Sequence, residues 1–232
     1  MPTQQIEAKT LREMAYQAIK DSILNNELLP GQEVLITSVA ASLGISQTPV
    51  REAVTRLAAD GLMEYTPHRT LRVAGLDEDD VREVYEVRRL LEPYAAECAA
   101  RRLARDPHLR ERLLEVLRRA EHIAKVGPVI SLEEYVGIDL HLNEIFLGAV
   151  ENRLFREMFT LLANRSLRIR TFAEATADTV NRRLIGTVTG EHIGIVRAIL
   201  AEDAERARRL VAEHLANGEA RTIAAVRERL RG

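Results

Sequence analysis

The segment from residue 37 to residue 61 constrains the fold more than any other, because two glycines divide it into two short helices. "TSVAASLG" ends on Gly44, and "SQTPVREAVTRLAADG" ends on Gly61. Glycine commonly follows the last turn of a helix because it adopts a left-handed conformation without a steric penalty. Ser46 can cap the second helix, and Pro49 is tolerated in its first turn. The segment therefore predicts two helices joined by a tight turn.

The second helix of this pair has one apolar and one polar face. Val50, Val54 and Leu57 recur at the spacing of a buried helical face. The opposite face carries Gln47, Arg51 and Thr55. A guanidinium on that face can donate two hydrogen bonds to O6 and N7 of guanine in a major groove. The alternative is a solvated arginine that pairs with the acidic Glu52 or Asp60.

The flanking segments complete a winged helix-turn-helix. A helical pattern covers residues 10–27, and Pro30-Gly31 marks a turn. Short strands are expected at 33–36, 62–66 and 70–75. In this order of elements the tight turn orients the second helix, so that its first residues can enter a major groove. We expect the DNA-binding domain to span residues 8–75.

Composition excludes several classes of protein. The net charge of −2 means that a nucleic-acid interface must come from a local patch. Aromatic residues make up 4% and tryptophan is absent, which argues against a stacking-based single-strand binder. Cys98 is the only cysteine, so no intrachain disulfide is possible, and no run of 18 apolar residues occurs. These features predict a cytoplasmic protein that does not contact a membrane.

The chain from residue 77 to residue 231 is nearly all helical in its pattern, and we expect a second, all-helical domain there. Six helices are predicted, at 77–104, 108–126, 131–149, 151–176, 180–201 and 203–230. The predicted fold class is therefore mainly α, with an N-terminal winged helix-turn-helix and a C-terminal helical bundle.

Two histidines in the last two helices indicate a metal site. His192 and His214 each lie about ten residues from the break at Asp203, roughly 15 Å by helical rise, so they come level in an antiparallel pair. Asp139 and Asn143 are four residues apart on one face of the third of these helices. Two imidazoles and this oxygen pair can hold one divalent metal. The alternative is two unrelated surface histidines and a capping aspartate.

The first domain resembles the DNA-binding domain of the GntR family of bacterial repressors. The resemblance lies in "LPGQEV", "LGISQTPVREAVTRLAADGL" and "LRVAG". It implies DNA contacts by Ser46, Thr48 and Arg51, and Gln47 stands where the family usually has arginine. It also assigns the tip of the wing, with threonine in place of the usual glycine, to His68, Arg69 and Thr70.

The second domain resembles the effector domain of the FadR-type branch, in its six-helix, VanR-like form. The motifs are "VYEVRRLLEPYAAECAA", "DLHLNEIFLGAVENRLF" and "EHIGIVRAILAEDAERARRLVAEHL". The resemblance implies a metal held by Asp139, Asn143, His192 and His214, with asparagine where histidine is usual. A shift by two residues would use His141 instead, but His141 is about 200° around the helix from Asp139. Zinc is the expected metal, with nickel or manganese as alternatives.

The resemblance also implies that Arg88 faces a cavity and meets the carboxylate of an effector. From the residues alone, Arg88 is equally an ordinary i, i+4 partner of Glu92, worth a few tenths of a kcal/mol. Further cationic candidates are Arg165, Arg168 and Arg170, while His108 and His122 are expected at the surface.

Together these features predict a homodimeric transcription regulator. It would bind a pseudo-palindromic operator in double-stranded DNA and respond to a small organic acid. The competing hypothesis is a metal-dependent hydrolase with an accessory DNA-binding domain, although the sequence shows no nearby general base, nucleophile motif or phosphate loop. A third possibility is a dimerisation scaffold whose helical bundle binds nothing.

Overall fold

The computed structural model describes residues 2–68, 70–126, 132–174 and 182–231. Contacts divide the chain into two compact units, residues 1–77 with 164–173, and residues 78–163 with 174–232. The described part is mainly helical, as predicted, and contains one two-stranded sheet. None of the helices in this part is both long and apolar enough to cross a bilayer.

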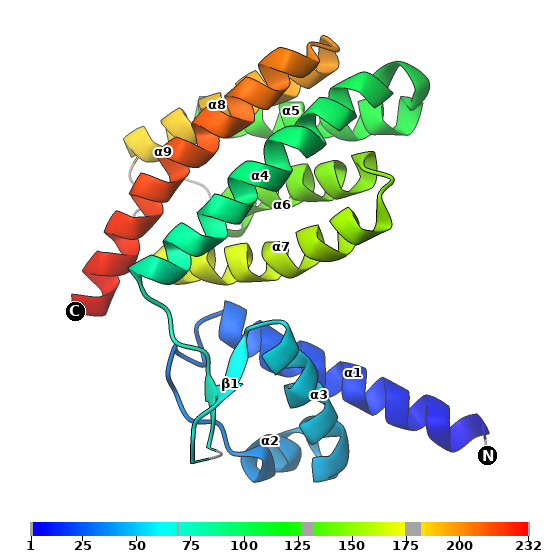
Figure 1. The fold of residues 1–232 in the computed structure, drawn as a ribbon, viewed down its shortest axis with the longest axis vertical. Helices are drawn as coiled ribbons and strands as arrows, with labels where there is room; N and C mark the ends of the chain where they lie inside the picture. The colour runs from blue at the N-terminus through cyan, green and yellow to red at the C-terminus, as the bar shows by residue number, and fades with distance from the viewer. Residues whose placement is uncertain (1, 69, 127–131, 175–181, 232) are drawn as a thin grey trace. The chain divides into compact units, whose positions relative to one another are not determined.

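The first unit begins with three helices (Figure 1). They are α1 (Pro2–Leu24), α2 (Ile36–Leu43) and α3 (Gln47–Ala59). Gly44 follows α2 at a φ of 65°, and Gly61 follows α3 at a φ of 73°. Both values lie in the left-handed region that favours glycine, so the two predicted breaks are confirmed for the predicted reason.

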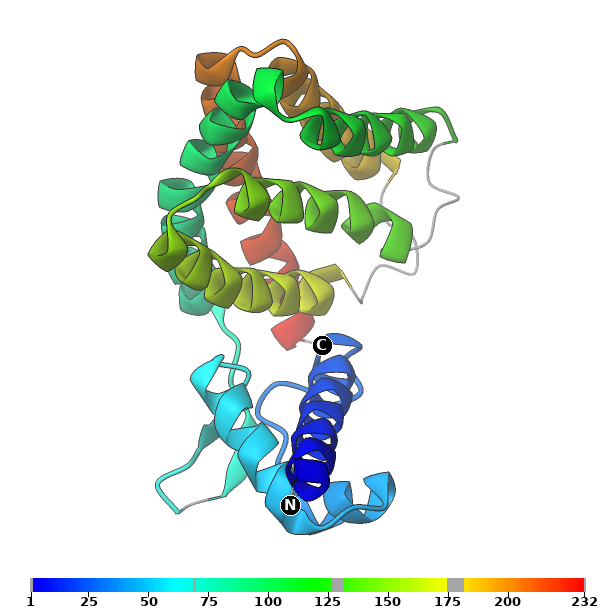
Figure 2. The ribbon, with the colours of Figure 1, turned by 90° about the vertical axis from the view of Figure 1, so that its right-hand side faces the viewer.

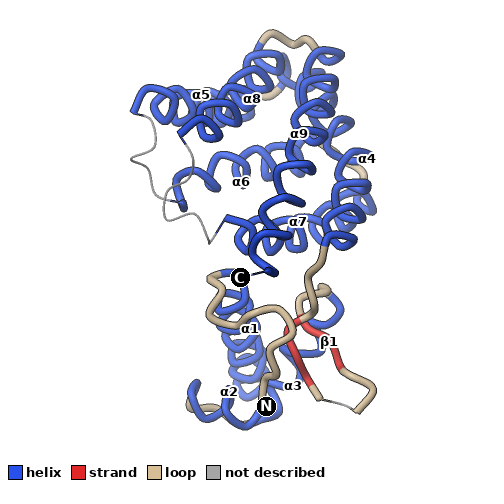
Figure 3. The backbone as a smooth tube through the Cα atoms, turned by 90° about the vertical axis from the view of Figure 1, so that its left-hand side faces the viewer, coloured by secondary structure: helices blue, strands red, loops and turns tan. Residues whose placement is uncertain are grey.

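Two strands form the ribbon that follows α3, β1 (Met63–Tyr65) and β2 (Leu71–Val73), shown in red in Figure 3. They are antiparallel, with Glu64 opposite Arg72, and the guanidinium of Arg72 donates to the carboxylate of Glu64 over 2.7 Å. The predicted third strand at 33–36 is wrong, because Glu33 forms only an isolated bridge to Arg72. The chain enters α2 at Ile36, which leaves too few extended residues for a strand.

The core of the first unit fixes which face of α3 points outward. Val50, Val54 and Leu57 of α3 are fully buried, and α3 packs on α1, where Ala15 and Ile19 are also buried. Burying these side chains stabilises the unit by about 1.5–3 kcal/mol for each large one. The polar face of α3 is left at the surface by the same packing.

From residue 78 on, the chain forms helices in the predicted order, all in the second unit except residues 164–173 of the fourth long helix. They are α4 (Glu78–Arg102) with a 3-10 turn (Leu103–Arg105), α5 (Pro107–Val126), α6 (Leu132–Ala149), α7 (Arg153–Glu174), α8 (Arg182–Leu200) and α9 (Ala204–Arg231). Within the described residues, their ends differ from the prediction by a few residues at most. α4 packs along α9, and α5 packs along α8 (Figures 1 and 2).

A tight joint between α8 and α9 makes these two helices antiparallel. Glu202 adopts a left-handed φ of 59° there. The carboxylate of Asp203 accepts a hydrogen bond from the backbone N–H of Arg206 over 3.0 Å, which caps α9. The joint therefore sets the axial register in which side chains of α8 and α9 meet.

Candidate nucleic-acid interface and candidate metal centre

The residues predicted to contact DNA lie at the start of α3. Ser46, Gln47, Thr48 and Arg51 are all exposed. Ser46 occupies the N-cap position with extended backbone angles, but its side chain makes no capping hydrogen bond. The predicted N-cap position of Ser46 is therefore confirmed, and the Ser46 hydroxyl is exposed at the helix N-terminus.

Arg51 does not form the ion pair of the alternative interpretation. Its guanidinium donates to the side-chain oxygen of Gln47, one turn earlier on the same face, over 3.3 Å. Asp60 accepts a hydrogen bond from a tyrosine hydroxyl of α1 over 2.7 Å, and Glu52 lies 3.8 Å from an arginine of α1. The first turn of α3 contains no acidic residue. Its positive helix end and its arginine suit a negatively charged duplex.

The tip of the wing is partly described. His68 is exposed, and Arg69 lies outside the described residues. Thr70 is half-buried, and its backbone N–H donates to the Thr66 hydroxyl over 3.1 Å, while the N–H of Thr66 donates to the Thr70 carbonyl over 2.8 Å. Thr70 thus closes the wing through hydrogen bonds at the position where the family usually has glycine.

Three of the predicted metal ligands meet in the second unit. Asp139 of α6, His192 of α8 and His214 of α9 each offer one ligand atom, and these atoms lie within 4.8 Å of one another. Nε2 of His192 lies 2.9 Å from Oδ1 of Asp139, and Nε2 of His214 lies 3.8 Å from the same oxygen. The two imidazole rings are 4.8 Å apart, so the histidines are level as the helical rise predicts.

Asn143 and His141 are the two alternatives for the fourth ligand, and they occupy different environments. Asn143 is half-buried one turn beyond Asp139 on α6. His141 points away from this cluster, since its Nδ1 lies 2.5 Å from the carbonyl of Gly137 and its Nε2 lies 3.4 Å from the guanidinium of Arg119. His141 is therefore engaged by its own helix and by α5.

Glu191, which was not among the predicted site residues, contacts the nitrogen of His214 that faces away from Asp139. Its carboxylate lies 2.7 Å from Nδ1 of His214, and it also accepts hydrogen bonds from Asn217 and Arg221. Burial alone would raise the pKa of Glu191, but the hydrogen bonds from these three partners outweigh it and lower the pKa to about 2. In the sequence, only the position of Glu191 directly before His192 could have indicated its role.

The ionised state of Glu191 fixes the tautomer of His214. A carboxylate without its proton can only accept hydrogen bonds, so Nδ1 of His214 must carry the hydrogen. A ring that carries only this one hydrogen has its lone pair on Nε2, the nitrogen that lies 3.8 Å from Oδ1 of Asp139. A carboxylate behind a ligating histidine is the usual arrangement that orients the ring toward a metal.

The donor set fits a divalent cation. Two imidazole nitrogens and one carboxylate oxygen suit zinc and its neighbours, and three protein ligands leave coordination positions open. Because a single carboxylate cannot neutralise a divalent ion, a bound cation would keep a net positive charge. Such a site attracts small anions.

Arg88 of α4 is buried, unlike an ordinary i, i+4 surface pair. It is 3% exposed, and its Nε donates to Glu92 over 2.6 Å. Its guanidinium carbon lies 4.7 Å from the centre of the Tyr85 ring. Burial alone would lower the pKa of Arg88, but the charge of Glu92, with a smaller contribution from Asp139, raises it. Asp139 is therefore one of the charges that raise the pKa of Arg88.

The other cationic candidates are placed elsewhere. Arg165, Arg168 and Arg170 lie in the segment 164–173, which groups with the first unit. His108 and His122 are both exposed, as predicted.

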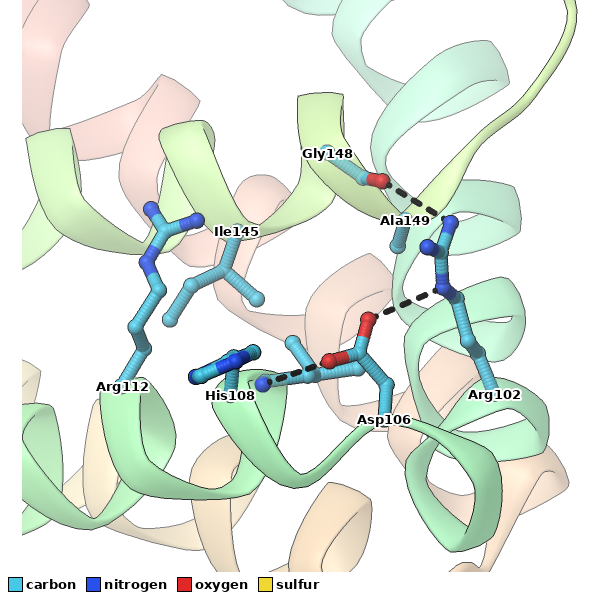
Figure 4. A pocket seen from close by; sticks show the side chains of 8 residues that line it. Arg102, Asp106, His108, Arg112, Ile145, Gly148 and Ala149 are labelled. Carbon is cyan, nitrogen blue, oxygen red and sulfur yellow. Dashed lines mark hydrogen bonds and ion pairs between the residues drawn. The ribbon is translucent and has the colours of Figure 1, made fainter.

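A pocket of about 90 Å³ lies where α4, α5 and α6 come together (Figure 4). Asp106 links α4 to α5 at this pocket, because it accepts hydrogen bonds from the Arg102 guanidinium over 3.1 Å and from the Leu109 N–H over 3.0 Å. Arg102 also donates to the Gly148 carbonyl over 3.3 Å. None of the three metal-ligand candidates lines this pocket, and its polar groups hold the helices together.

Comparison with known proteins identifies both parts of the chain. Residues 11–73 match the model of bacterial regulatory proteins of the gntR family, and residues 83–217 match the FCD domain. An HTH-type transcriptional regulator in the TAR-I ttuE-ttuC' intergenic region of Agrobacterium vitis is 40% identical over 82 residues. That alignment spans 35% of this chain and 48% of the relative, about half of its length.

Solved structures share the fold. E. coli McbR/YncC has a TM-score of 0.73 at 23% identity, over 90% of this chain and 95% of that one. The Zn2+-bound FCD domain of TM0439 has a TM-score of 0.51 at 25% identity, over 65% of this chain and 96% of that one. The Agrobacterium vitis relative and E. coli McbR are named as transcriptional regulators, not as hydrolases of the kind that the competing hypothesis requires. The chain therefore belongs to the GntR family of bacterial regulatory proteins, and its helical part is an FCD domain.

Proposed function

We propose that this protein regulates transcription as a homodimer whose affinity for a pseudo-palindromic operator is modulated by a small carboxylate. The carboxylate binds beside a divalent metal, with zinc as the preferred ion. The DNA-binding domain comprises residues 8–75, and residues 77–231 bind the effector and dimerise. The observation that carries this proposal is the meeting of Asp139, His192 and His214 within 4.8 Å.

Two observations support a metal with an effector carboxylate bound beside it. A zinc-bound FCD domain is among the structures that this chain resembles. Arg88 is a buried cation whose pKa is raised mainly by Glu92 and in part by Asp139, and its guanidinium can donate hydrogen bonds to a carboxylate. In this proposal Asp139, Asn143, His192 and His214 hold the metal, and Arg88 meets the effector carboxylate.

The proposed mechanism is a shift between two arrangements of the dimer. The effector must bind one arrangement more tightly than the other, because a ligand with equal affinity for both shifts nothing. Half-sites of an operator repeat at about one helical turn of DNA or a multiple of it. A change of a few ångströms in the separation of the two α3 helices would therefore weaken operator binding.

Replacing Arg51 with alanine tests the DNA-reading role of α3. We expect specific operator affinity to fall by about 1–3 kcal/mol, because one fork of hydrogen bonds to a base or phosphate is lost. Gel-shift titration at fixed salt measures the change, with circular dichroism to check that helicity is retained. Unchanged operator affinity would show that Arg51 is only a solvated surface residue.

A second substitution on the same face of α3 is expected to raise the affinity for DNA. Gln47→Arg should strengthen binding to any duplex and steepen the dependence of log affinity on log salt by about one unit, because one further phosphate is neutralised. Thr55→Ala serves as the control, since the Thr55 hydroxyl donates to the carbonyl of Arg51 within its own helix over 2.9 Å.

An exposed apolar surface on α4 and α7 suits a second copy of the chain. It consists of Val87, Leu90 and Tyr94 on α4 with Leu154, Met158 and Leu161 on α7. Leu90 is 72% exposed and Leu154 is 64% exposed, and the rings of Tyr94 and Phe155 are 5.6 Å apart, which joins the two helices. Contiguous apolar surfaces of this kind usually mark an interface. A two-fold symmetric operator requires two recognition helices, and one self-complementary surface supplies them.

Replacing Leu90 with glutamate should weaken this dimer. We expect the dimer dissociation constant to rise at least about tenfold, because a charge would be buried at the centre of the interface. Sedimentation velocity over a dilution series measures this change. Leu230→Glu is the matched control, since Leu230 is also exposed but lies at the end of α9. A parent protein that sediments as a monomer at all concentrations would contradict the homodimer.

A further inference from the structure

Thr189 of α8 has a buried hydroxyl with no hydrogen-bond partner. The residue is fully buried, and its Oγ1 is unsatisfied. Threonines in helices usually donate to a carbonyl of the preceding turn. Thr55, Thr160 and Thr171 do so in this protein, over 2.9, 2.8 and 3.1 Å. The Thr189 hydroxyl departs from this behaviour, although burying an unpaired hydroxyl costs free energy.

The position of Thr189 connects it to the candidate metal centre. Thr189 precedes His192 by three residues, and side chains three apart lie on the same face of a helix. His192 is buried on that face, with its Nε2 2.9 Å from Asp139. Ile185, one turn before Thr189, and Val188, its neighbour in the chain, are also buried. An unpaired hydroxyl on this face is a group that can meet a bound molecule.

We propose that Thr189 is a specificity-determining residue for the effector, and that its hydroxyl donates a hydrogen bond to an oxygen of the bound acid. This inference rests on the proposed function, which places a small carboxylate beside the metal. An ionised carboxylate only accepts hydrogen bonds, and a threonine hydroxyl can donate one. A buried hydroxyl discriminates strongly, because an analogue without an oxygen at this position leaves it unpaired. The ligand class is therefore a short acid with an acceptor oxygen facing α8.

Thr189→Val tests the hydroxyl, since valine keeps the shape of the side chain and removes the oxygen. Full-length, zinc-loaded protein is screened by thermal shift against citrate, malate, 2-oxoglutarate and gluconate, and the strongest stabiliser of the parent is titrated. We expect Thr189→Val to bind that acid about tenfold more weakly, as for the loss of one hydrogen bond. Thr189→Ser should stay within about threefold of the parent, because serine retains the donor.

Two controls separate this role from a structural one. Thr160→Val should bind the acid like the parent, because Thr160 donates within α7. Without any acid, Thr189→Val should melt at the temperature of the parent or above it, because an unpaired buried hydroxyl has been removed. A lower melting temperature would show that the hydroxyl is already bonded in the free protein, and it would overturn the assignment.

The remaining outcomes distinguish this inference from the proposed function. If the acid stabilises the parent and Thr189→Val binds it equally well, Thr189 is not a ligand contact, while the effector site stands. If the parent holds zinc but none of the four acids stabilises it, the proposed effector class is wrong, and the assignment of Thr189 is overturned with it.

Discussion

Replacing Arg88 with alanine is expected to lower the free energy of unfolding by about 3–5 kcal/mol, because the carboxylate of Glu92 would remain buried without its partner. Both side chains are almost fully buried, and Nε of Arg88 donates to Glu92 over 2.6 Å. Urea titration followed by circular dichroism measures the change. A loss of less than about 1 kcal/mol would mean that the pair is solvated like an ordinary surface pair.

This instability means that the single variant cannot show whether Arg88 anchors the effector. Arg88→Met combined with Glu92→Gln removes both charges while keeping side chains of similar length, and such replacements of buried pairs are often neutral or stabilising. We expect the double variant to fold and to lose the thermal shift that the best acid gives the parent. Glu92→Gln alone retains the guanidinium and an oxygen that can accept its hydrogen bond, so its thermal shift with the acid shows whether loss of the carboxylate by itself abolishes binding. A double variant that binds the acid like the parent would contradict the role of Arg88.

Replacing His192 with alanine is expected to lower zinc affinity by more than about 100-fold, since even supporting residues behind a ligand are typically worth 10–100-fold. His214→Ala should do the same, because both rings face Asp139. Zinc content is measured by elemental analysis after zinc loading and dialysis. His141→Ala is the control and should retain zinc like the parent, because His141 bonds to Gly137 and Arg119 instead.

Asn143 allows the opposite change at the same site. An amide oxygen is a weaker ligand for zinc than an imidazole nitrogen, so Asn143→His should raise zinc affinity and slow its loss during dialysis. Glu191→Gln should weaken zinc binding by about 10–100-fold, because the carboxylate behind His214 is lost. If the parent holds no zinc after loading, and His192→Ala and His141→Ala match it, the cluster is not a metal site.

Local signals in the sequence were enough to predict the DNA-binding part. Gly44 and Gly61 adopt the left-handed conformation at the predicted helix ends, and Val50, Val54 and Leu57 are buried as their spacing predicts. These features depend on backbone sterics and helical periodicity, which act over a few residues. The strand expected at 33–36 failed because strand formation depends on pairing with a distant segment, and that pairing is limited to one bridge.

In the helical part, the positions of residues along the helix axes were predictable from the sequence, but the rotation of each helix about its axis was not. The constant rise per residue placed His192 and His214 level on either side of the joint at Asp203, and their rings are 4.8 Å apart. Which side chains converge on them depends on how each helix is rotated by its packing. The sequence therefore determined the recognition helix, the order of the helices and the level of the two histidines. Only the tertiary structure decided that Glu191 supports His214 and that the unpaired hydroxyl of Thr189 is buried, because burial and convergence are set by contacts between distant segments.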